Sequence, residues 1–438
     1  MELKQANRKI LDQYTKKVLM FMLAFPIVFM LMGIILSCVE AGSVFGGYDR
    51  MKNGLGSILN SSALLITDFF EIGGIGPTLI NVALISFFNL YLLYQLKMPA
   101  GGLMIAAFFT VIGFSFFGKT ILNILPIYLG GYLYSKNQNI PFQNVFLVSM
   151  FATALAPMVS FIANSDVMLN DGVAQFMGMI LGTAIGFIVM PLSSTMLKFH
   201  DGFNLYNVGF TAGIIGTVLT SILRSFNMVV DPVLHISTAN SVPVILMMYS
   251  AMGYFIYIAL RINPKIYREY HKIFVHKGRS ITDFTVLRGY DYTFLNMGIM
   301  GIISITAVLL LGGVINGPII AGIFTVVGFS AFGKHPKNAL PIMIGVSLAV
   351  VFYEFDISST PILMTMLFST TLSPIAGTYG PIMGMVAGMI HLAVVLNIGI
   401  IQGGINLYNN GFGGGLVAAM ILPIISSLMK ESKKSNKW

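Results

Sequence analysis

Long runs of apolar residues recur along the whole chain, and this recurrence constrains the fold more than any other feature. A membrane-spanning helix needs about 20 apolar residues, whereas barrel strands read as alternating segments of about 10 residues. The runs here are continuous, and only 9% of the residues are charged, against about 25% in soluble domains. We therefore expect an all-α integral membrane protein with about 10–14 transmembrane or half-crossing helices.

Basic residues gather at both ends of the chain and in the stretch 261–292. The three groups are Lys4, Arg8, Lys9, Lys16 and Lys17; Arg261, Lys265, Arg268, Lys272, Lys277, Arg279 and Arg288; and Lys430, Lys433, Lys434 and Lys437. Basic segments beside apolar runs mark the cytoplasmic side of a membrane, so the net charge of +9 indicates topology and not nucleic-acid binding. Asp166, Asp171 and Glu354 fall in loops of the other side. We expect a multi-pass protein of the bacterial plasma (inner) membrane with both termini in the cytoplasm.

An internal repeat divides the chain. Residues 109–127 read FTVIGFSFFGKTILNILPI and residues 324–342 read FTVVGFSAFGKHPKNALPI. Residues 202–213 read GFNLYNVGFTAG and residues 404–415 read GINLYNNGFGGG. Two shorter pairs keep the same order, namely FATALAP at 151–157 with FSTTLSP at 368–374, and GMILG at 178–182 with GMVAG at 384–388. This shared order indicates two copies of one unit.

The span count gives the two copies opposite orientations. Two expected spans precede the first FTVIG segment, and one expected span separates the basic loop from the second. We expect two inverted repeats: residues 1–260 as the first, with extra N-terminal spans, residues 261–292 as a basic cytoplasmic loop, and residues 293–438 as the second. Inverted repeats around a site at the membrane midplane are typical of transporters.

Two features that recur in both copies predict a substrate pathway. The first is the short apolar segment bounded by glycine, for which the alternative is ordinary packing of two helices through Gly113 and Gly328. The second is the NLYN element, whose polar groups are costly in hydrocarbon without partners and which alternatively bonds one helix to another. The expected pathway residues, with the two phenylalanines as narrow collars, are Asn204, Tyr206, Asn207, Asn406, Tyr408, Asn409, Thr110, Ser115, Thr325, Ser330, Phe114 and Phe329.

Each FTVxGFSxFGK segment ends in a lysine, Lys119 or Lys334. These lysines are expected to be interfacial anchors that reach the headgroups, or to attract anions toward the two mouths of the pathway. We expect no chain of ionisable residues inside the membrane, and His391 is interpreted as a lone packed histidine. The sequence has no phosphate-binding loop, HExxH motif or catalytic set, so we expect no enzyme, no cofactor and no metal.

Several of these segments resemble the urea transporter family. The resemblance rests on Gly101–Ile105, on residues 123–130, and on the Tyr-Asn pairs of the NLYN elements. It implies a urea-transporter-like fold and a homo-oligomer, a trimer or a dimer. The chain as a whole resembles a bacterial membrane protein family known only as a domain of unknown function.

We therefore expect a facilitative transporter or channel for a small polar solute, urea- or amide-like, whose pathway runs between two inverted repeats. The expected partners are that solute and the lipid bilayer. One alternative is a sodium-coupled secondary transporter of a small anion, which would use the two lysines and the positive ends of half-helices. Another is a membrane scaffold that transports nothing, which would have no water-accessible midplane.

Overall fold

The computed structural model describes residues 2–164, 171–231 and 233–435. Asp166 and Lys437, used above to predict sidedness, lie outside the described residues. Apart from two isolated bridges, no strand occurs in the described ranges. Nine helical stretches there are long and apolar enough to cross a membrane, and the helices Gly102–Phe114, Gly317–Phe329 and Pro336–Phe352 are apolar but shorter. The chain is therefore an all-helical membrane protein, which confirms that part of the prediction.

The elements fall into two series in which most members follow the same order. The first series comprises α1 (Glu2–Ala41), α2 (Val44–Leu59), α3 (Phe69–Gly73), α4 (Ile75–Gln95), α5 (Gly102–Phe114), α6 (Ile121–Asn137), α7 (Gln143–Ala152), η1 (Thr153–Leu155), α8 (Ala156–Ala163), α9 (Asp171–Met196), η2 (Leu197–Phe199) and α10 (Asn207–Ser225). The second comprises α11 (Val242–Ile262), α12 (Ile266–Glu269), η3 (Tyr270–Val275), α13 (Phe284–Leu287), α14 (Tyr290–Leu310), α15 (Gly317–Phe329), α16 (Pro336–Phe352), α17 (Thr360–Ser369), η4 (Thr370–Leu372), α18 (Ser373–Tyr379), α19 (Pro381–Ile401) and α20 (Asn409–Ser435).

Equivalent residues of the two series make equivalent contacts. The Asn81 amide donates to the carbonyls of residues 34 and 38 positions later, and the Asn296 amide does the same. Gly182 of α9 lies against Pro126 of α6, and Gly384 of α19 lies against Pro341 of α16. Gly384 is thus the equivalent of Gly182, whereas the sequence pairing of GMILG with GMVAG matched it to Gly178. That pairing was wrong by four residues, because a shift of about one helical turn keeps the glycines on the same face.

Helices α5 and α15 form the centre of the molecule. A side-chain carbon on Gly113 would lie 2.9 Å from the Cα of Ala321, and one on Gly328 would lie 3.1 Å from the Cα of Ala106. Residue numbers rise along one helix as they fall along the other, so the two helices are antiparallel. Both are almost entirely buried. The tight packing expected as the alternative for Gly113 and Gly328 is therefore present.

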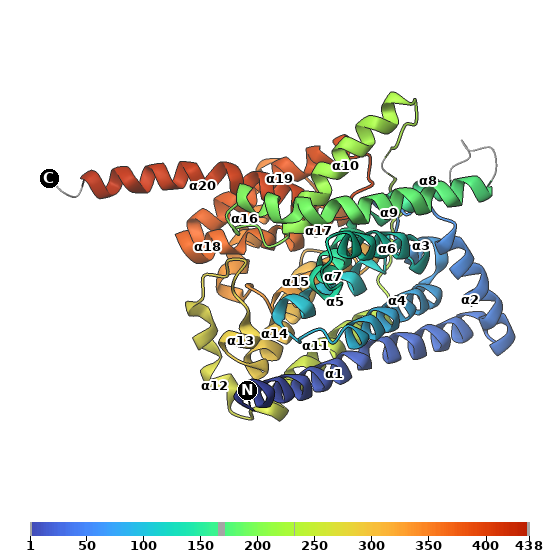
Figure 1. Ribbon diagram of the computed structural model, residues 1–438, viewed down its shortest axis with the longest axis horizontal. Helices are drawn as coiled ribbons and strands as arrows, with labels where there is room; N and C mark the ends of the chain where they lie inside the picture. The colour runs from blue at the N-terminus through green and yellow to red at the C-terminus, as the bar shows by residue number, and fades with distance from the viewer. Residues whose placement is uncertain (1, 165–170, 232, 436–438) are drawn as a thin grey trace.

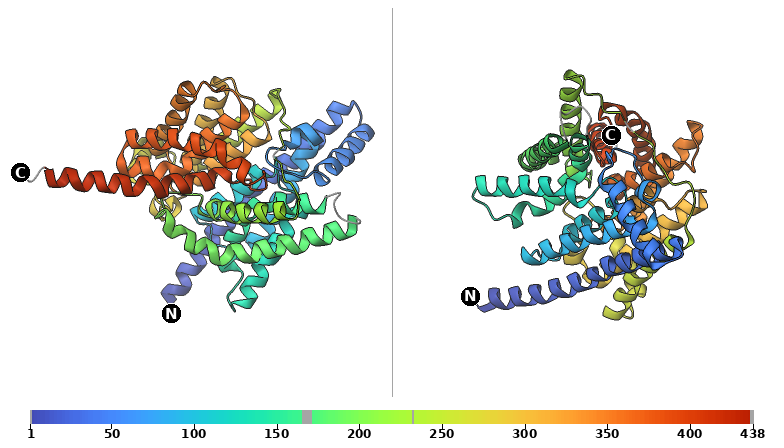
Figure 2. Two further views of the ribbon diagram at one scale, coloured as in Figure 1. Left: turned by 90° about the horizontal axis from the view of Figure 1, so that it is seen from above. Right: turned by 90° about the vertical axis from the view of Figure 1, so that its right-hand side faces the viewer.

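The start of α1 and the end of α20 lie in the same half of the molecule's long axis. Figure 1 places the labels N and C, α12 and α13 on the left and α2 on the right, and the view from above agrees for both chain ends and α2 (Figure 2). Helix α20 runs from the middle toward the end marked C, and α10 runs away from it (Figure 1). We call the end with the termini and the basic loop the terminal end, and the other the distal end.

The linker between α10 and α11 forms a short extended pairing, which the sequence reading missed. The N–H of Ile66 donates to the Val233 carbonyl, and the N–H of His235 donates to the Ile66 carbonyl, giving a parallel bridge. Leu65, in the segment that pairs with this linker, also donates its N–H to the Gly404 carbonyl. We call residues 233–235 the cover strand. At the equivalent place in the other half, Ser280 N–H donates to the Gly202 carbonyl, and no second strand lies there among the described residues.

Candidate functional site

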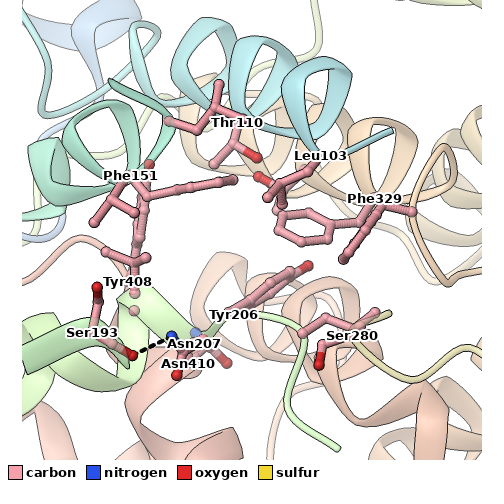
Figure 3. A pocket seen from close by; sticks show the side chains of 18 of the residues that line it. Leu103, Thr110, Phe151, Ser193, Tyr206, Asn207, Ser280, Phe329, Tyr408 and Asn410 are labelled. Carbon is pink, nitrogen blue, oxygen red and sulfur yellow. Dashed lines mark hydrogen bonds between the residues drawn. The ribbon is translucent and has the colours of Figure 1, made fainter. Parts of the chain in front are cut away.

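A cavity of about 320 Å³ lies between α5, α7, α15 and the segments that lead into α10 and α20. Figure 3 shows Leu103, Thr110 and Phe329 on one side of it and Tyr206 and Asn207 on the other. The expected pathway residues that line this cavity are Thr110, Phe114, Tyr206, Asn207, Thr325, Phe329 and Tyr408. The structure therefore brings together parts of both repeated motifs from both halves.

The other expected pathway residues lie outside the cavity lining and bond within the protein. Asn204 accepts a hydrogen bond from the Tyr206 N–H at 3.1 Å, and Asn406 accepts one from the Tyr408 N–H at 3.0 Å. These turns fix the backbone that presents each tyrosine ring. Ser115 and Ser330 each donate to the carbonyl four residues earlier. Asn409 accepts from Asn410.

The two lysines lie in the interior, which contradicts the prediction of interfacial anchors. Both are 0% exposed. The Lys119 amine lies 2.5 Å from the Tyr408 hydroxyl, and the Lys334 amine contacts the Tyr206 hydroxyl and lies 2.7 Å from Thr370 Oγ1. Each lysine therefore meets the tyrosine of the other half. A phenol oxygen accepts hydrogen bonds, so each amine finds a partner that no local spacing revealed.

Neither lysine has an acidic partner. Among the described residues only two salt bridges occur, Arg50 with Glu40 and Lys272 with Glu269, and neither involves these lysines. No chain of ionisable residues inside the membrane was expected, and the sequence analysis did not place Lys119 and Lys334 in the interior, where both are buried. Buried ionisable groups in membrane proteins are costly and usually functional.

Sequence reasoning missed several residues that line the cavity. Phe151 and Phe368 line it from α7 and α17, and a signal existed, because they open the paired FATALAP and FSTTLSP segments. Asn410 also lines it, and its side-chain oxygen lies 3.1 Å from Nε2 of His391. His391 is fully buried, as expected of a packed histidine, but it positions a cavity residue.

The cavity is open at one end and closed at the other. Leu103 lines it and is 37% exposed, and Ser280 lines it from the basic loop, so the open mouth faces the terminal end. In the other half, the equivalents of Leu103 and Val148 are Pro318 and Thr365, and both are buried. The deepest lining residues, such as Thr110, are also buried.

A carboxylate holds each short helix to the opposite half. Asp68 accepts hydrogen bonds from the N–H groups of Phe70, Ser237 and Gly317 at 3.0, 3.1 and 3.2 Å. Gly317 is the first residue of α15, so Asp68 binds the N-terminal end of that helix and ties it to the segment that follows the cover strand. Burial raises the pKa of Asp68 to about 7, although the three N–H donors lower it. Its equivalent, Asp283, accepts from the Gly102 N–H at the start of α5 at 2.9 Å.

Comparison with known proteins identifies a family and no activity. A family model described as "Protein of unknown function (DUF1576)" matches residues 48–225 and 262–427, more than three quarters of the chain. No curated protein and no solved structure matches the chain. The likeness to urea transporters therefore stays a prediction.

Proposed function

We propose that this chain, which belongs to the DUF1576 family of proteins of unknown function, is a membrane carrier that moves a small solute by alternating access. The cavity carries the proposal. It is lined by equivalent residues of both halves, yet Leu103 at its terminal end is exposed, whereas the equivalent Pro318 is buried. An open channel would need a continuous path, and a scaffold would need no cavity, so this geometry favours a carrier over both.

The carrier would consist of two inverted repeats that exchange conformations. The antiparallel pairing of α5 with α15 and the opposite courses of α10 and α20 support this arrangement. Because α1 packs on α4 as α11 packs on α14, the proposed second repeat begins at Val242, earlier than the boundary at residue 293 expected from the sequence. When the repeats exchange conformations, Pro318 and Thr365 become accessible and Leu103 becomes buried.

Single-cysteine labelling tests this exchange. In a Cys38→Ser background, Val148→Cys should react with a membrane-impermeant thiol reagent from the terminal side. Thr365→Cys should react only from the distal side and more slowly, because its site is closed in this structure. Asn139→Cys, which is exposed at the end of α6, serves as a control that labels from the terminal side.

Two outcomes would contradict the carrier. Equal and simultaneous labelling of Val148→Cys and Thr365→Cys from both sides would indicate an open channel. No labelling of Thr365→Cys under any condition, in protein that labels normally at Val148→Cys, would indicate a cavity that never exchanges sides.

A further inference from the structure

The cavity wall is mostly apolar and aromatic. Its aromatic members are Phe114, Phe151, Phe329, Phe332, Phe368, Tyr206 and Tyr408. A pocket lined in this way binds ligands with a hydrocarbon body and uses its few polar groups for orientation. A fully polar solute of urea size would lose its bonds to water without regaining them against such a wall.

The two buried amines lie directly behind this wall. The Lys119 nitrogen is 4.7 Å from the centre of the Tyr408 ring and 5.3 Å from that of Phe114. The Lys334 nitrogen is 4.4 Å from the centre of the Tyr206 ring and 5.3 Å from that of Phe329. All four rings line the cavity. Two basic groups therefore flank the solute space, each separated from it by one ring.

One polar group of the wall is without a partner. The hydroxyl of Thr110 lines the cavity, is buried and has no hydrogen-bond partner, whereas its equivalent Thr325 donates to the Ala321 carbonyl. Figure 3 shows the Thr110 side chain directed toward the space between the two sides of the cavity. A buried polar atom left without a bond is costly, so this hydroxyl is available to a ligand.

From these observations we infer that the solute is an organic anion with an apolar body, of the aromatic or branched monocarboxylate class. Lys119 and Lys334 supply the charge that selects it, and Thr110 supplies a hydrogen bond. This substrate class rests on the proposed carrier function, because it describes the solute of the same cavity. A charge buried without a counter-charge is strongly destabilising, and the anion supplies the counter-charge that the protein lacks.

Anion binding is expected to bring a proton with it. The titratable groups around the two lysines are Tyr206 and Tyr408, with Tyr128 beyond Tyr408 and His335 beside Lys334. None of them is an acid that ionises near neutral pH. An arriving carboxylate is therefore the first negative charge near either amine, and it favours the protonated amine.

Binding measurements on the full-length protein in lipid nanodiscs test this inference, with benzoate, the neutral isostere benzamide and urea as probes. Benzoate should bind at least tenfold more tightly than benzamide at pH 6.5. If one proton binds with each anion, the Kd for benzoate rises about tenfold per pH unit. Titrations in buffers of different ionisation enthalpy should show the same proton uptake directly.

Variants then assign the charge. Lys119→Met and Lys334→Met should each weaken benzoate binding about tenfold or more and flatten its pH dependence, while benzamide binding stays the same. Lys337→Met, which changes an exposed lysine near Lys334, is the matched control and should alter nothing. The wild-type comparison of benzoate with benzamide remains decisive if a methionine variant fails to fold.

Benzamide or urea binding as tightly as benzoate, or benzoate binding that ignores pH and both lysines, would overturn the inference. In either case the carrier proposal stands if Val148→Cys and Thr365→Cys still label from opposite sides. Conversely, proton-linked benzoate binding in a protein in which Thr365→Cys never labels would support the anion site and contradict the carrier proposal.

Discussion

Replacing Asp68 with alanine is expected to open the distal end of the cavity. The carboxylate accepts hydrogen bonds from three backbone N–H groups, of which those of Phe70 and Gly317 are buried and that of Ser237 is partly buried in the closed arrangement. Each buried N–H that loses its acceptor costs about 1–3 kcal/mol, whereas water satisfies the same groups once the mouth opens. Since 1.4 kcal/mol corresponds to about a tenfold change in population, labelling of Thr365→Cys from the distal side should accelerate at least tenfold.

Asp356→Ala is the matched control for this change. The Asp356 carboxylate also accepts backbone and side-chain bonds, from Ser358, but it is exposed. Its loss should leave the labelling rate unchanged. A lower thermal stability for Asp68→Ala with unchanged labelling would show that Asp68 serves folding alone.

The pH dependence of the same labelling gives a second readout. Burial raises the pKa of Asp68 to about 7 in the closed arrangement, and in a hydrated open mouth it would return toward about 4. The closed arrangement therefore holds the proton more tightly, is most favoured at low pH and loses that advantage as pH rises to about 7. Distal labelling should rise between pH 5 and pH 7 and then level off, and Asp68→Asn should remove this rise. The labelling rate of Ser358→Cys at each pH serves as the reference, because any cysteine reacts faster as its thiolate fraction increases with pH.

Gly186→Ala should destabilise the protein, although alanine normally favours a helix. A side-chain carbon at Gly186 would lie 2.0 Å from the Ile127 carbonyl oxygen, so α6 and α9 would have to separate. Overpacking of this kind costs about 1–3 kcal/mol or more. The matched control is Gly253→Ala in α11, where nothing lies within 4 Å of the added carbon, and there alanine should be neutral or stabilising.

Thermal unfolding of the two variants in detergent measures the difference. Gly186→Ala should unfold several degrees below the wild type, and Gly253→Ala at or above it. Gly388→Ala should behave like Gly186→Ala, because its added carbon would lie 2.2 Å from the Ile342 carbonyl oxygen. Equal melting temperatures for all three variants would mean that these helices separate at little cost.

The sequence predicted the helical class and much of the cavity, because both depend on local patterns. Apolar runs determine membrane helices, and the repeated FTVxGFSxFGK segment marked the residues that meet at the centre. Phe114 and Phe329 were expected to face a pathway, and they line the cavity.

Other features depend on contacts that no local pattern encodes. Lys119 was placed at an interface because its partner, Tyr408, lies 289 residues away. The segment 64–68 has no helical pattern, and its extended form depends on pairing with the cover strand, far along the chain. The alignment of α9 with its counterpart α19 was wrong by four residues. A glycine one helical turn away fits the sequence pattern equally well, but it contacts different residues in the folded protein.

The cover strand has a kinetic consequence. It pairs with the chain at the distal end only, so a carrier of this design spends most of its time open toward the terminal end. The affinity measured from a given side is reduced by the fraction of molecules open to that side. Half-saturation from the distal side therefore requires a higher solute concentration than from the terminal side. Without a gradient, the ratio of maximal rate to half-saturation must still be equal in both directions, since no carrier moves a solute uphill unaided. In a carrier of this design the strand would thus set the solute concentration to which each face of the membrane responds, and would leave the final equilibrium unchanged.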